Sequence, residues 1–471
     1  MNRVTGMRVS RLTYGNKMEL KKRVLVLGTG YVSAPAVEYL TQDPGTQVTV
    51  ASVMMNQAEE LAARYPNTTA VMLDVTSQQS LLESLVKDHD VVISLLPYQH
   101  HAMIAEHCIR KKVNLVTASY VCPALRELHS RAEEAGITVV CEMGLDPGID
   151  HMLAMECIDQ AKEEGCTVES YISYCGGLPA LESAGNPLRY KFSWSPRGVL
   201  LNTLNPATFV KDNKVMSFPP GGTLLEAAAP MDFMPGFDLE GLPNRDSTTY
   251  ARLYGIESAH TVIRGSLRYR GFSSAISGFV KLGLITTDPF PAEDSSNRPA
   301  SWKDLISHLI GVPPSASTEA FHDAVCDKLG RDQGKMEVLK WFGMLGDDPV
   351  PQADSVLEAV TKHLEAKLHY EPGERDMVIL RNEVGVRRRG GELETRRAEL
   401  LLFGEPGGHS AMARTVGFPA AIVARMLIDG EIERKGLVLP LSRSIYGPVL
   451  QRLSARGLCI SRTCPVTGKH L

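Results

Sequence analysis

Apolar and polar positions alternate in blocks through the first third of the chain. Short, nearly unbroken apolar runs are separated by stretches with helical spacing, such as residues 35–40 and 57–65. Strands that are buried on both faces have continuous apolar runs, and their alternation with helices is typical of a parallel sheet. Right-handed crossovers then give a Rossmann-type, doubly wound α/β sheet. The six predicted strands are 23–27, 48–51, 70–73, 91–94, 114–117 and 137–140.

The pattern changes after Asp146. From Ser170 to about residue 285, glycine and proline punctuate short β-rich segments, which predicts a second α/β domain with a mixed or antiparallel sheet. Helical periodicity follows over residues 291–365, for example at 302–310 and 355–368, and predicts a helical insert. The apolar runs at 377–380 and 397–403 are expected to rejoin the second sheet.

An apolar helix is expected over residues 415–429, with Pro419 in its first turns and Gly430 as its C-cap. We expect the last helices to pack back on the first domain. The predicted organisation is a leader (1–20), a doubly wound domain (21–145), a second α/β domain (146–290 and 370–405), a helical insert (291–369) and C-terminal helices (406–471).

Length and composition narrow the class of protein. With 471 residues the chain is too long for one ordinary core, and 44% hydrophobic and 22% charged residues are an ordinary globular balance. The net charge of −4 offers no general attraction to nucleic acid or to an anionic membrane surface. No uninterrupted apolar run approaches the ~20 residues that span a bilayer. Nine cysteines without metal-ligand spacing favour a reduced intracellular protein and no metal site.

Residues 1–20 differ in composition from the rest of the chain. They are basic, they contain several hydroxyl residues, and they have no acid before Glu19. This is the composition of a mitochondrial transit peptide, and a disordered leader is the alternative. The first interpretation predicts a mitochondrial protein and the second a cytoplasmic one.

The first chemical signal is a glycine turn. A strand leads directly into Gly28-Thr29-Gly30, and a helix-like stretch follows Tyr31-Val32. Gly28 permits the tight turn, Gly30 lets a pyrophosphate approach the backbone, and the helix N-terminus supplies free N–H groups. Ser33 replaces the third glycine of the usual fingerprint and is still small enough to pack on the strand. The turn in this context predicts a dinucleotide site, and a nucleotide-free sheet with an incidental turn is the alternative.

The acid that usually binds the adenosine ribose is missing. The second strand ends at Ala51-Ser52-Val53, which offers neither an acid for the ribose nor an arginine for a 2′-phosphate. Ser52 or Gln57 could donate to the ribose instead. Asp74, after the third strand, either lies near the adenine or caps the helix that follows it.

Three polar segments follow strands four, five and six. They are Ser94-Leu95-Leu96-Pro97-Tyr98, Ala118-Ser119-Tyr120 and Gly144 to His151, and they share one crevice because ligands bind beyond the carboxyl ends of such strands. Tyr120 and Asp146 are the titratable groups best placed for proton transfer, although Asp146-Pro147-Gly148 is also an ordinary turn. We expect His100-His101 to begin a solvated helix, and His151 to pack or cap rather than catalyse.

The second domain contains Arg189, Arg245, Arg264 and Arg268 among tyrosines, asparagines and serines. A substrate rich in carboxylates needs such residues, because guanidinium binds carboxylate in a bidentate fashion. A single arginine is more often part of a surface salt bridge. Only the concentration of arginines in this domain therefore points to an anionic substrate.

Longer strings are more specific than the glycine turn. They are Val26 to Val32, Ser94 to Tyr98, Val116 to Tyr120, Gly144 to Ala154, Tyr171 to Pro179, Pro187 to Pro196, Pro243 to Ser247 and Leu267 to Tyr269. In these strings the chain resembles the glutamate-forming saccharopine dehydrogenases, and it is most similar to the dehydrogenase half of the animal bifunctional enzymes. The resemblance runs from about residue 21 to about residue 450, and Cys175 to Pro179 and Phe192 to Pro196 are its most specific parts.

The resemblance implies NAD-dependent oxidation of saccharopine in lysine degradation. Hydride leaves the carbon that bears the secondary amine, water adds to the imine, and the product splits into glutamate and α-aminoadipate semialdehyde. It also implies a small-molecule partner and no metal, and we expect a homo-oligomer, with a dimer favoured. The implied catalytic residues are Tyr120 and Asp146; the cofactor residues are Gly28, Thr29, Gly30, Tyr31, Val32, Gln57, Leu96, Ala118, Ser119 and Asp146; and the substrate residues are Ser119, Tyr120, Arg245, Ser266, Leu267 and Arg268.

Two departures from the family pattern leave alternatives open. Val53 stands where members of the animal type have aspartate, so NADP is not excluded beside NAD. The reductase half of the bifunctional enzymes is absent, which predicts a stand-alone enzyme, a fragment or a truncated gene model. The alternative functions are a related dehydrogenase for a substrate with fewer carboxylates, such as carboxynorspermidine, and a non-catalytic dinucleotide sensor.

Overall fold

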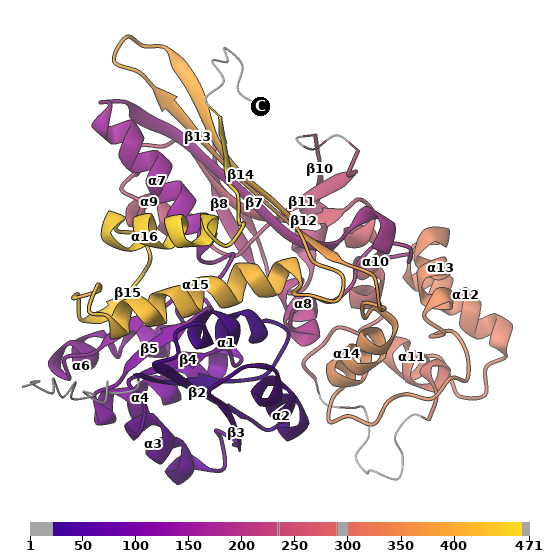
Figure 1. Ribbon diagram of the computed structural model, residues 1–471. Helices are drawn as coiled ribbons and strands as arrows, with labels where there is room; N and C mark the ends of the chain where they lie inside the picture. The colour runs from indigo at the N-terminus through magenta and orange to yellow at the C-terminus, as the bar shows by residue number, and fades with distance from the viewer. Residues whose placement is uncertain (1–21, 233, 235, 289, 291–299, 464–471) are drawn as a thin grey trace, which may run out of the picture.

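Two β-sheets joined by helices form the computed structural model, which describes residues 22–288 except 233 and 235, residue 290, and residues 300–463. Figure 1 shows the first sheet at the lower left, the second sheet running across the top, and four helices, α11 to α14, on the right. The predicted leader (1–20) and the start of the predicted insert (291–299) lie outside the described residues.

The first sheet is entirely parallel, which confirms the predicted fold class. Its strand order is β15-β6-β5-β4-β1-β2-β3, so the chain reverses direction across the sheet between β1 and β4. In β1, Leu25 packs on the α3–α4 side while Val24 and Val26 pack on the other side, and this explains the unbroken apolar runs. The strands are β1 (Lys22–Leu27), β2 (Thr46–Ser52), β3 (Thr68–Met72), β4 (Val91–Ser94), β5 (Asn114–Thr117), β6 (Thr138–Val140) and β15 (Gly436–Val438).

The seventh strand, β15, was not among the six predicted strands. It has only three residues, and it pairs in parallel with β6. The Thr138 hydroxyl donates to the carbonyl of Arg434 at 2.7 Å, across 296 positions of sequence. A run this short has no periodicity, so only the tertiary structure reveals it.

Helices cover both faces of the first sheet. Lys112, directly after α4, adopts a left-handed conformation with φ of 59° and ends that helix before β5 begins. The helices of this unit are α1 (Ala34–Thr41), α2 (Met55–Arg64), α3 (Gln79–Lys87), α4 (His101–Lys111), α5 (Pro123–Arg126) and α6 (His129–Glu134), and α7 (Ile149–Glu163) leads out of it.

The second sheet is mixed, as predicted. Its main order is β10-β11-β12-β7-β13-β14-β16, and β12 pairs in parallel with β7 while the other neighbours are antiparallel. The strands are β7 (Thr167–Pro179), β8 (Ala207–Lys211), β9 (Lys214–Phe218), β10 (Ala229–Met231), β11 (Leu239–Pro243), β12 (Thr261–Tyr269), β13 (Asp376–Arg387), β14 (Leu393–Phe403) and β16 (Ser461–Thr463).

Most helices of the second unit share a core with its sheet around Trp302, Phe279 and Phe342. The exception is α9, whose Tyr250 lies in the core that also contains α15 and the first sheet. The bounds of these helices are α8 (Pro196–Asn202), α9 (Thr249–Leu253), α10 (Phe272–Lys281), α11 (Trp302–Ile310), α12 (Thr318–Lys328), α13 (Gln333–Trp341) and α14 (Val356–Lys367). We propose the domain division near the turn at Gly144–Gly148, where the chain leaves the first sheet.

Helix α15 (Ala411–Ile428) lies between the two sheets (Figure 1) and contacts both β4 and β13. It begins four residues before the predicted start, because Ser410 caps it by accepting the Ala413 N–H at 3.0 Å, so Pro419 lies in mid-helix. Gly430, with φ of 75°, follows its end as expected. The helix is long and apolar enough to cross a membrane, but 78% of it is buried in the protein, as in a core helix. Helix α16 (Arg443–Ser454) packs beside it.

Candidate active site

The predicted glycine turn lies between β1 and α1. Gly28 has φ of 102°, and its N–H donates to Ala51 on β2 at 2.9 Å. A Cβ atom on Gly30 would meet nothing within 4 Å, so the backbone here faces open space. Ser33 is the N-cap of α1, and its hydroxyl donates to the Gly30 carbonyl at 3.0 Å. The free space and the adjacent helix N-terminus fit a pyrophosphate.

Two neighbours of this turn reach other parts of the structure. The Tyr31 hydroxyl donates to Glu365 on α14 at 2.6 Å, and this links the turn to the helices on the right of Figure 1. Val32 lies against α15, where a Cβ on Gly417 would be 2.7 Å from the Val32 carbonyl oxygen. Both residues therefore support the turn from outside.

The end of β2 is uncharged, as predicted. The Thr29 hydroxyl lies 2.9 Å from Ser52 Oγ and 3.1 Å from Gln57 Oε1. Ser52 is buried and also accepts the Met54 N–H at 3.0 Å, so it is occupied within the protein. Gln57 is exposed and keeps its amide N–H groups for a ligand, whereas the neighbouring side chain of Val53 is 54% exposed and cannot donate.

The structure tests the predictions for Asp74 and His101. The Asp74 carboxylate accepts the Thr76 hydroxyl at 2.6 Å and the Ser77 hydroxyl at 2.7 Å, and these bonds lower its pKa to about 2. They close the turn after β3. The N-cap of α3 is Gln78, without a side-chain cap, so the capping interpretation of Asp74 is wrong. His101 does begin α4, but the prediction of a solvated residue is wrong, because its ring packs beneath β4 with Nδ1 3.2 Å from Ser94 Oγ. Burial lowers the pKa of His101 to about 4.

Tyr120 and Asp146, the predicted proton-transfer pair, are bonded to each other. Tyr120 follows β5 and Asp146 follows β6, and the Tyr120 hydroxyl donates to Asp146 Oδ1 at 2.5 Å. The second unit closes over this pair: Asn244 Nδ2 donates to the Tyr120 oxygen at 3.3 Å, and the Arg245 guanidinium lies 4.9 Å from the centre of the Tyr120 ring. Arg264 on β12 donates to Asp146 Oδ1 at 2.6 Å. The structure thus gathers a phenol, a carboxylate and two guanidinium groups from distant segments.

The Arg264 guanidinium bonds to two carboxylates in a buried cluster. Besides Asp146 it contacts Asp150, whose Oδ1 accepts the Gly148 N–H at 2.6 Å. Burial raises the pKa of Asp146, although Arg264 opposes the shift. At Asp150, burial also favours a raised pKa, but Arg264 and His151 outweigh it and the pKa is lowered.

Tyr120 shares this environment. Burial raises its pKa well above 10, so the phenol keeps its proton at neutral pH. Asp146 is consequently the acceptor of the pair and Tyr120 the donor. Such a pair can hold a proton close to a reacting group and pass it on.

A second buried pair lies behind the first. His151 Nε2 is 2.7 Å from Glu142 Oε2, and His151 Nδ1 is 2.6 Å from the Tyr254 hydroxyl. Glu142 has φ of 61°, a conformation that is uncommon for glutamate, and its Oε1 accepts the Val121 N–H at 3.0 Å. His151 therefore packs and bonds inside the protein, as predicted, and Glu142 fixes the backbone directly after Tyr120.

The four arginines singled out in the second domain divide into two kinds. Arg189 donates to Asp238 at 3.0 Å near the surface, and Arg264 is bonded to internal carboxylates. Arg245 and Arg268 have no acidic partner among the described residues. Arg268 is nevertheless buried, with its guanidinium 5.3 Å from the ring centres of Tyr190 and Phe272 and its Nε without a hydrogen-bond partner.

Strand alternation places Arg264, Ser266 and Arg268 on one face of β12. Leu267 points the opposite way into the core, so only its backbone can reach a ligand on the Arg268 side, and its carbonyl already accepts from Arg268 at 2.6 Å. On the first sheet, Leu96, Ala118 and Ser119 are partly exposed after β4 and β5. Leu96 lies beside the glycine turn, and a Cβ on Gly28 would be 3.3 Å from its side chain.

Sequence reasoning missed Asn244, Asp150 and Glu142. Asp150 lies four residues after Asp146, and that spacing of two carboxylates at the start of a helix was a usable signal. Asn244 directly precedes Arg245, which has φ of 52°, and no local pattern indicates its contact with Tyr120.

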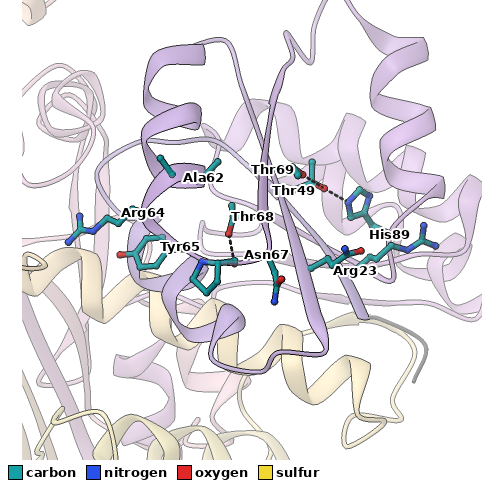
Figure 2. A pocket seen from close by; sticks show the side chains of 12 residues that line it. Arg23, Thr49, Ala62, Arg64, Tyr65, Asn67, Thr68, Thr69 and His89 are labelled. Carbon is teal, nitrogen blue, oxygen red and sulfur yellow. Dashed lines mark hydrogen bonds between the residues drawn. The ribbon is translucent and has the colours of Figure 1, made fainter. Parts of the chain in front are cut away.

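A cavity of about 500 Å3 lies away from this centre (Figure 2). Its lining residues come from the starts of β1, β2 and β3, the end of α2 and the loop before β4, whereas ligands of such sheets bind at the carboxyl ends of the strands. Arg64 and Arg23 lie at opposite ends of the hollow in Figure 2, and His89 is already bonded to Thr49 at 2.7 Å. The polar side chains that line the cavity therefore do not point toward one place where a ligand could bind.

Comparison with known proteins agrees with this geometry. The model of the saccharopine dehydrogenase NADP binding domain matches residues 24–140, and that of the saccharopine dehydrogenase C-terminal domain matches residues 144–458. The chain belongs to the saccharopine dehydrogenase family. Its first unit accordingly corresponds to the dinucleotide-binding domain of that family.

Curated relatives cover nearly the whole chain. Bovine mitochondrial alpha-aminoadipic semialdehyde synthase is 54% identical over 441 residues, which are 94% of this chain and 48% of that protein. Saccharopine dehydrogenase [NADP(+), L-glutamate-forming] of Saccharomyces cerevisiae is 40% identical over 437 residues, 92% of this chain and 96% of that protein. The chain thus spans about half the length of the animal relatives and nearly all of the yeast one.

A solved structure shares the fold. The apo saccharopine dehydrogenase (L-Glu forming) from Saccharomyces cerevisiae superposes with a TM-score of 0.83 at 38% identity, and the match covers 94% of this chain and 100% of that one. The predicted architecture of two α/β units, one with a doubly wound parallel sheet, is therefore confirmed.

Proposed function

We propose that the protein oxidises saccharopine with a nicotinamide dinucleotide and forms glutamate and α-aminoadipate semialdehyde. The observation that carries the proposal is the bonded pair Tyr120–Asp146 between the dinucleotide turn and the acid-free guanidinium groups of Arg245 and Arg268. The names of the relatives support the same reaction, since those in yeast and cattle are called saccharopine dehydrogenase and alpha-aminoadipic semialdehyde synthase.

The chain's own residues bind and orient the substrate. Saccharopine has three carboxylates. The guanidinium of Arg268 is buried without an acid beside it, which favours an anionic ligand, whereas Arg245 is exposed and lies over the Tyr120 ring. Arg268 and Arg245 can each take one carboxylate, and this leaves the secondary amine near Tyr120 and Asp146. A substrate with fewer carboxylates, such as carboxynorspermidine, has less use for two such arginines.

Tyr120 and Asp146 carry out the proton transfer in this mechanism. A bound nicotinamide supplies the hydride acceptor for the carbon that bears the amine. The amine nitrogen must lose its proton so that its lone pair can form the C=N bond, and Asp146 accepts that proton through Tyr120. Water then adds to the C=N carbon, and the C–N bond breaks to release the glutamate amine and leave the aldehyde.

The cofactor preference follows from the end of β2. No acid at Val53 repels a 2′-phosphate, and no lysine or arginine between Ala51 and Gln57 attracts one. We propose that NAD is used and that NADP is accepted with little discrimination. The NADP(+) in the name of the yeast relative supports the second half of this proposal.

The mitochondrial location remains a proposal. The composition of residues 1–20 and the word "mitochondrial" in the name of the bovine relative support it. Expression of the full chain and of a chain lacking residues 1–20, each fused to a fluorescent protein, tests it; cytosolic fluorescence from both would contradict it.

A spectrophotometric assay tests the function. Purified protein, saccharopine and either NAD or NADP should produce reduced cofactor at 340 nm and glutamate in equal amounts. Absence of turnover together with tight dinucleotide binding would favour a non-catalytic sensor, and turnover of carboxynorspermidine in place of saccharopine would favour the related dehydrogenase.

A further inference from the structure

Arg264 has a different position from the other arginines near the site. Its side chain is 2% exposed, and its guanidinium lies 4.2 Å from the centre of the Tyr250 ring. It contacts Asp146, Asp150 and, at 3.4 Å, the Tyr120 hydroxyl. All of its ionic partners are therefore parts of the protein.

The carboxylates around Arg264 are held in turn by other groups. Asp150 accepts the Gly148 N–H at 2.6 Å, and Asn382 on β13 donates to the Asp150 carbonyl at 2.8 Å. One guanidinium from β12 thus joins the turn that follows β6 to the first turn of α7. The contact crosses the boundary between the two units of the fold.

Arg264 and Arg268 provide a direct contrast. Both lie on the same face of β12, four residues apart and both buried, yet Arg264 bonds to two acids and Arg268 to none. A substrate carboxylate at Arg264 would have to compete with two internal carboxylates, whereas one at Arg268 would meet an unneutralised cation.

We propose that Arg264 is a positioning residue, which keeps Asp146 ionised and aimed at the Tyr120 hydroxyl, and that it does not bind substrate. This inference rests on the proposed function only for its kinetic consequences. Without the cation, two carboxylates would share one buried site, and one of them would take up a proton. Asp146 would then no longer accept a proton through Tyr120.

Several groups face Asp146 and contribute to its ionisation. Tyr120 comes from the end of β5, Arg264 from β12, Tyr250 from α9, and Asp150 and His151 from α7. Arg264 is the one permanently charged cation in this described set. Removal of Arg264 should therefore favour the protonated form of the Asp146 carboxyl.

Arg264→Met and Arg264→Lys are compared with Arg268→Met. Saccharopine turnover by wild type comes first and tests the proposed function alone. In Arg264→Met we expect kcat to fall by about a hundredfold at neutral pH, as for loss of a general base, with KM changed less than about threefold and partial recovery at higher pH. Arg264→Lys should restore part of kcat. Arg268→Met should instead weaken saccharopine binding in calorimetry.

A second readout needs no turnover. Infrared spectra of Arg264→Met at neutral pH should show more of the protonated-carboxyl band than spectra of wild type. Adding Asp146→Asn to Arg264→Met should remove that increase. The absence of that increase, or a loss of saccharopine affinity in Arg264→Met equal to that in Arg268→Met, overturns the inference. If Arg264→Met does not fold, Arg264→Lys decides: unchanged kcat with raised KM would make Arg264 a substrate ligand.

Discussion

Replacement of Arg268 by methionine should separate substrate binding from stability. Methionine fills a similar volume between Tyr190 and Phe272 but carries no charge. A charge-assisted hydrogen bond to a carboxylate contributes about 1.5–3 kcal/mol, so kcat/KM for saccharopine should fall by about tenfold to 150-fold. Most of the loss should appear in KM, because Arg268 lies away from the reacting pair Tyr120–Asp146.

The same change should leave the free energy of unfolding almost unaltered. The variant loses the bond to the Leu267 carbonyl, worth about 1 kcal/mol, and the contacts with two rings, worth about 0.5–2 kcal/mol. It also relieves a buried cation of its uncompensated desolvation, which costs several kcal/mol in an apolar site. We expect these terms to cancel to within about 1 kcal/mol in urea unfolding.

Steady-state kinetics and urea unfolding are measured on wild type, Arg268→Met and the control Arg189→Met. Arg189 carries the same group but is partly exposed and paired with Asp238, so its variant should keep wild-type kinetics. Wild-type kinetics in Arg268→Met, combined with a loss of stability above about 3 kcal/mol, would refute the argument and make Arg268 a structural cation.

Four further changes probe other parts of the site. Gly30→Val should abolish dinucleotide binding in calorimetry, because the valine side chain would occupy the space of the pyrophosphate. The far-ultraviolet circular dichroism spectrum should stay unchanged. An unchanged dinucleotide affinity would show that the phosphates bind elsewhere. Val53→Asp should tighten NAD by up to about 3 kcal/mol and weaken NADP by charge repulsion, and equal affinities before and after would show that residue 53 does not face the ribose. The oxidative rate should rise with pH, because the substrate amine must be unprotonated to form the C=N bond. Tyr120→Phe should reduce kcat by about a hundredfold and flatten this rise, whereas a profile superimposable on wild type would assign the proton to another group. Burial lowers the pKa of His101 to about 4, so this residue takes up a proton on unfolding between pH 6.5 and 4. The free energy of unfolding should therefore fall by about 3 kcal/mol as the pH drops through that window. His101→Gln should remove this contribution and the control His100→Gln should keep it, so an unchanged slope in His101→Gln would contradict the assignment.

Local patterns were sufficient for six of the seven strands of the first sheet and for its glycine turn. The continuous apolar run of β1 could be predicted as a strand because both of its faces are buried. Gly28 has φ of 102°, a conformation that few other residues tolerate. Tyr120 and Asp146 could be paired from sequence because both follow strands of one parallel sheet, whose carboxyl ends meet at one edge.

Other features depend on contacts that no local pattern encodes. Arg264 was grouped with the substrate-binding arginines, since its charge is visible in the sequence but its two internal partners are not. His101 was expected to be solvated because two histidines at a helix start are polar, yet the turn of α4 places the second beneath β4. Helix α15 was expected to begin at residue 415, with Pro419 in its first turns, because proline is favoured there. The helix begins at Ala411 instead, and burial between two sheets outweighs the cost of a proline in mid-helix.

The late return of the chain to the first sheet constrains synthesis on the ribosome. The amino-terminal domain cannot be completed when its own first 140 residues have emerged, because β15 at Gly436–Val438 closes one edge of its sheet and α15 covers one of its faces. Until then, the apolar surface of α1 and the unpaired edge of β6 are exposed to the cell. A truncation anywhere before α15 would therefore damage the domain farthest from the cut in sequence, and nascent chains of this protein should need chaperone protection for most of their translation.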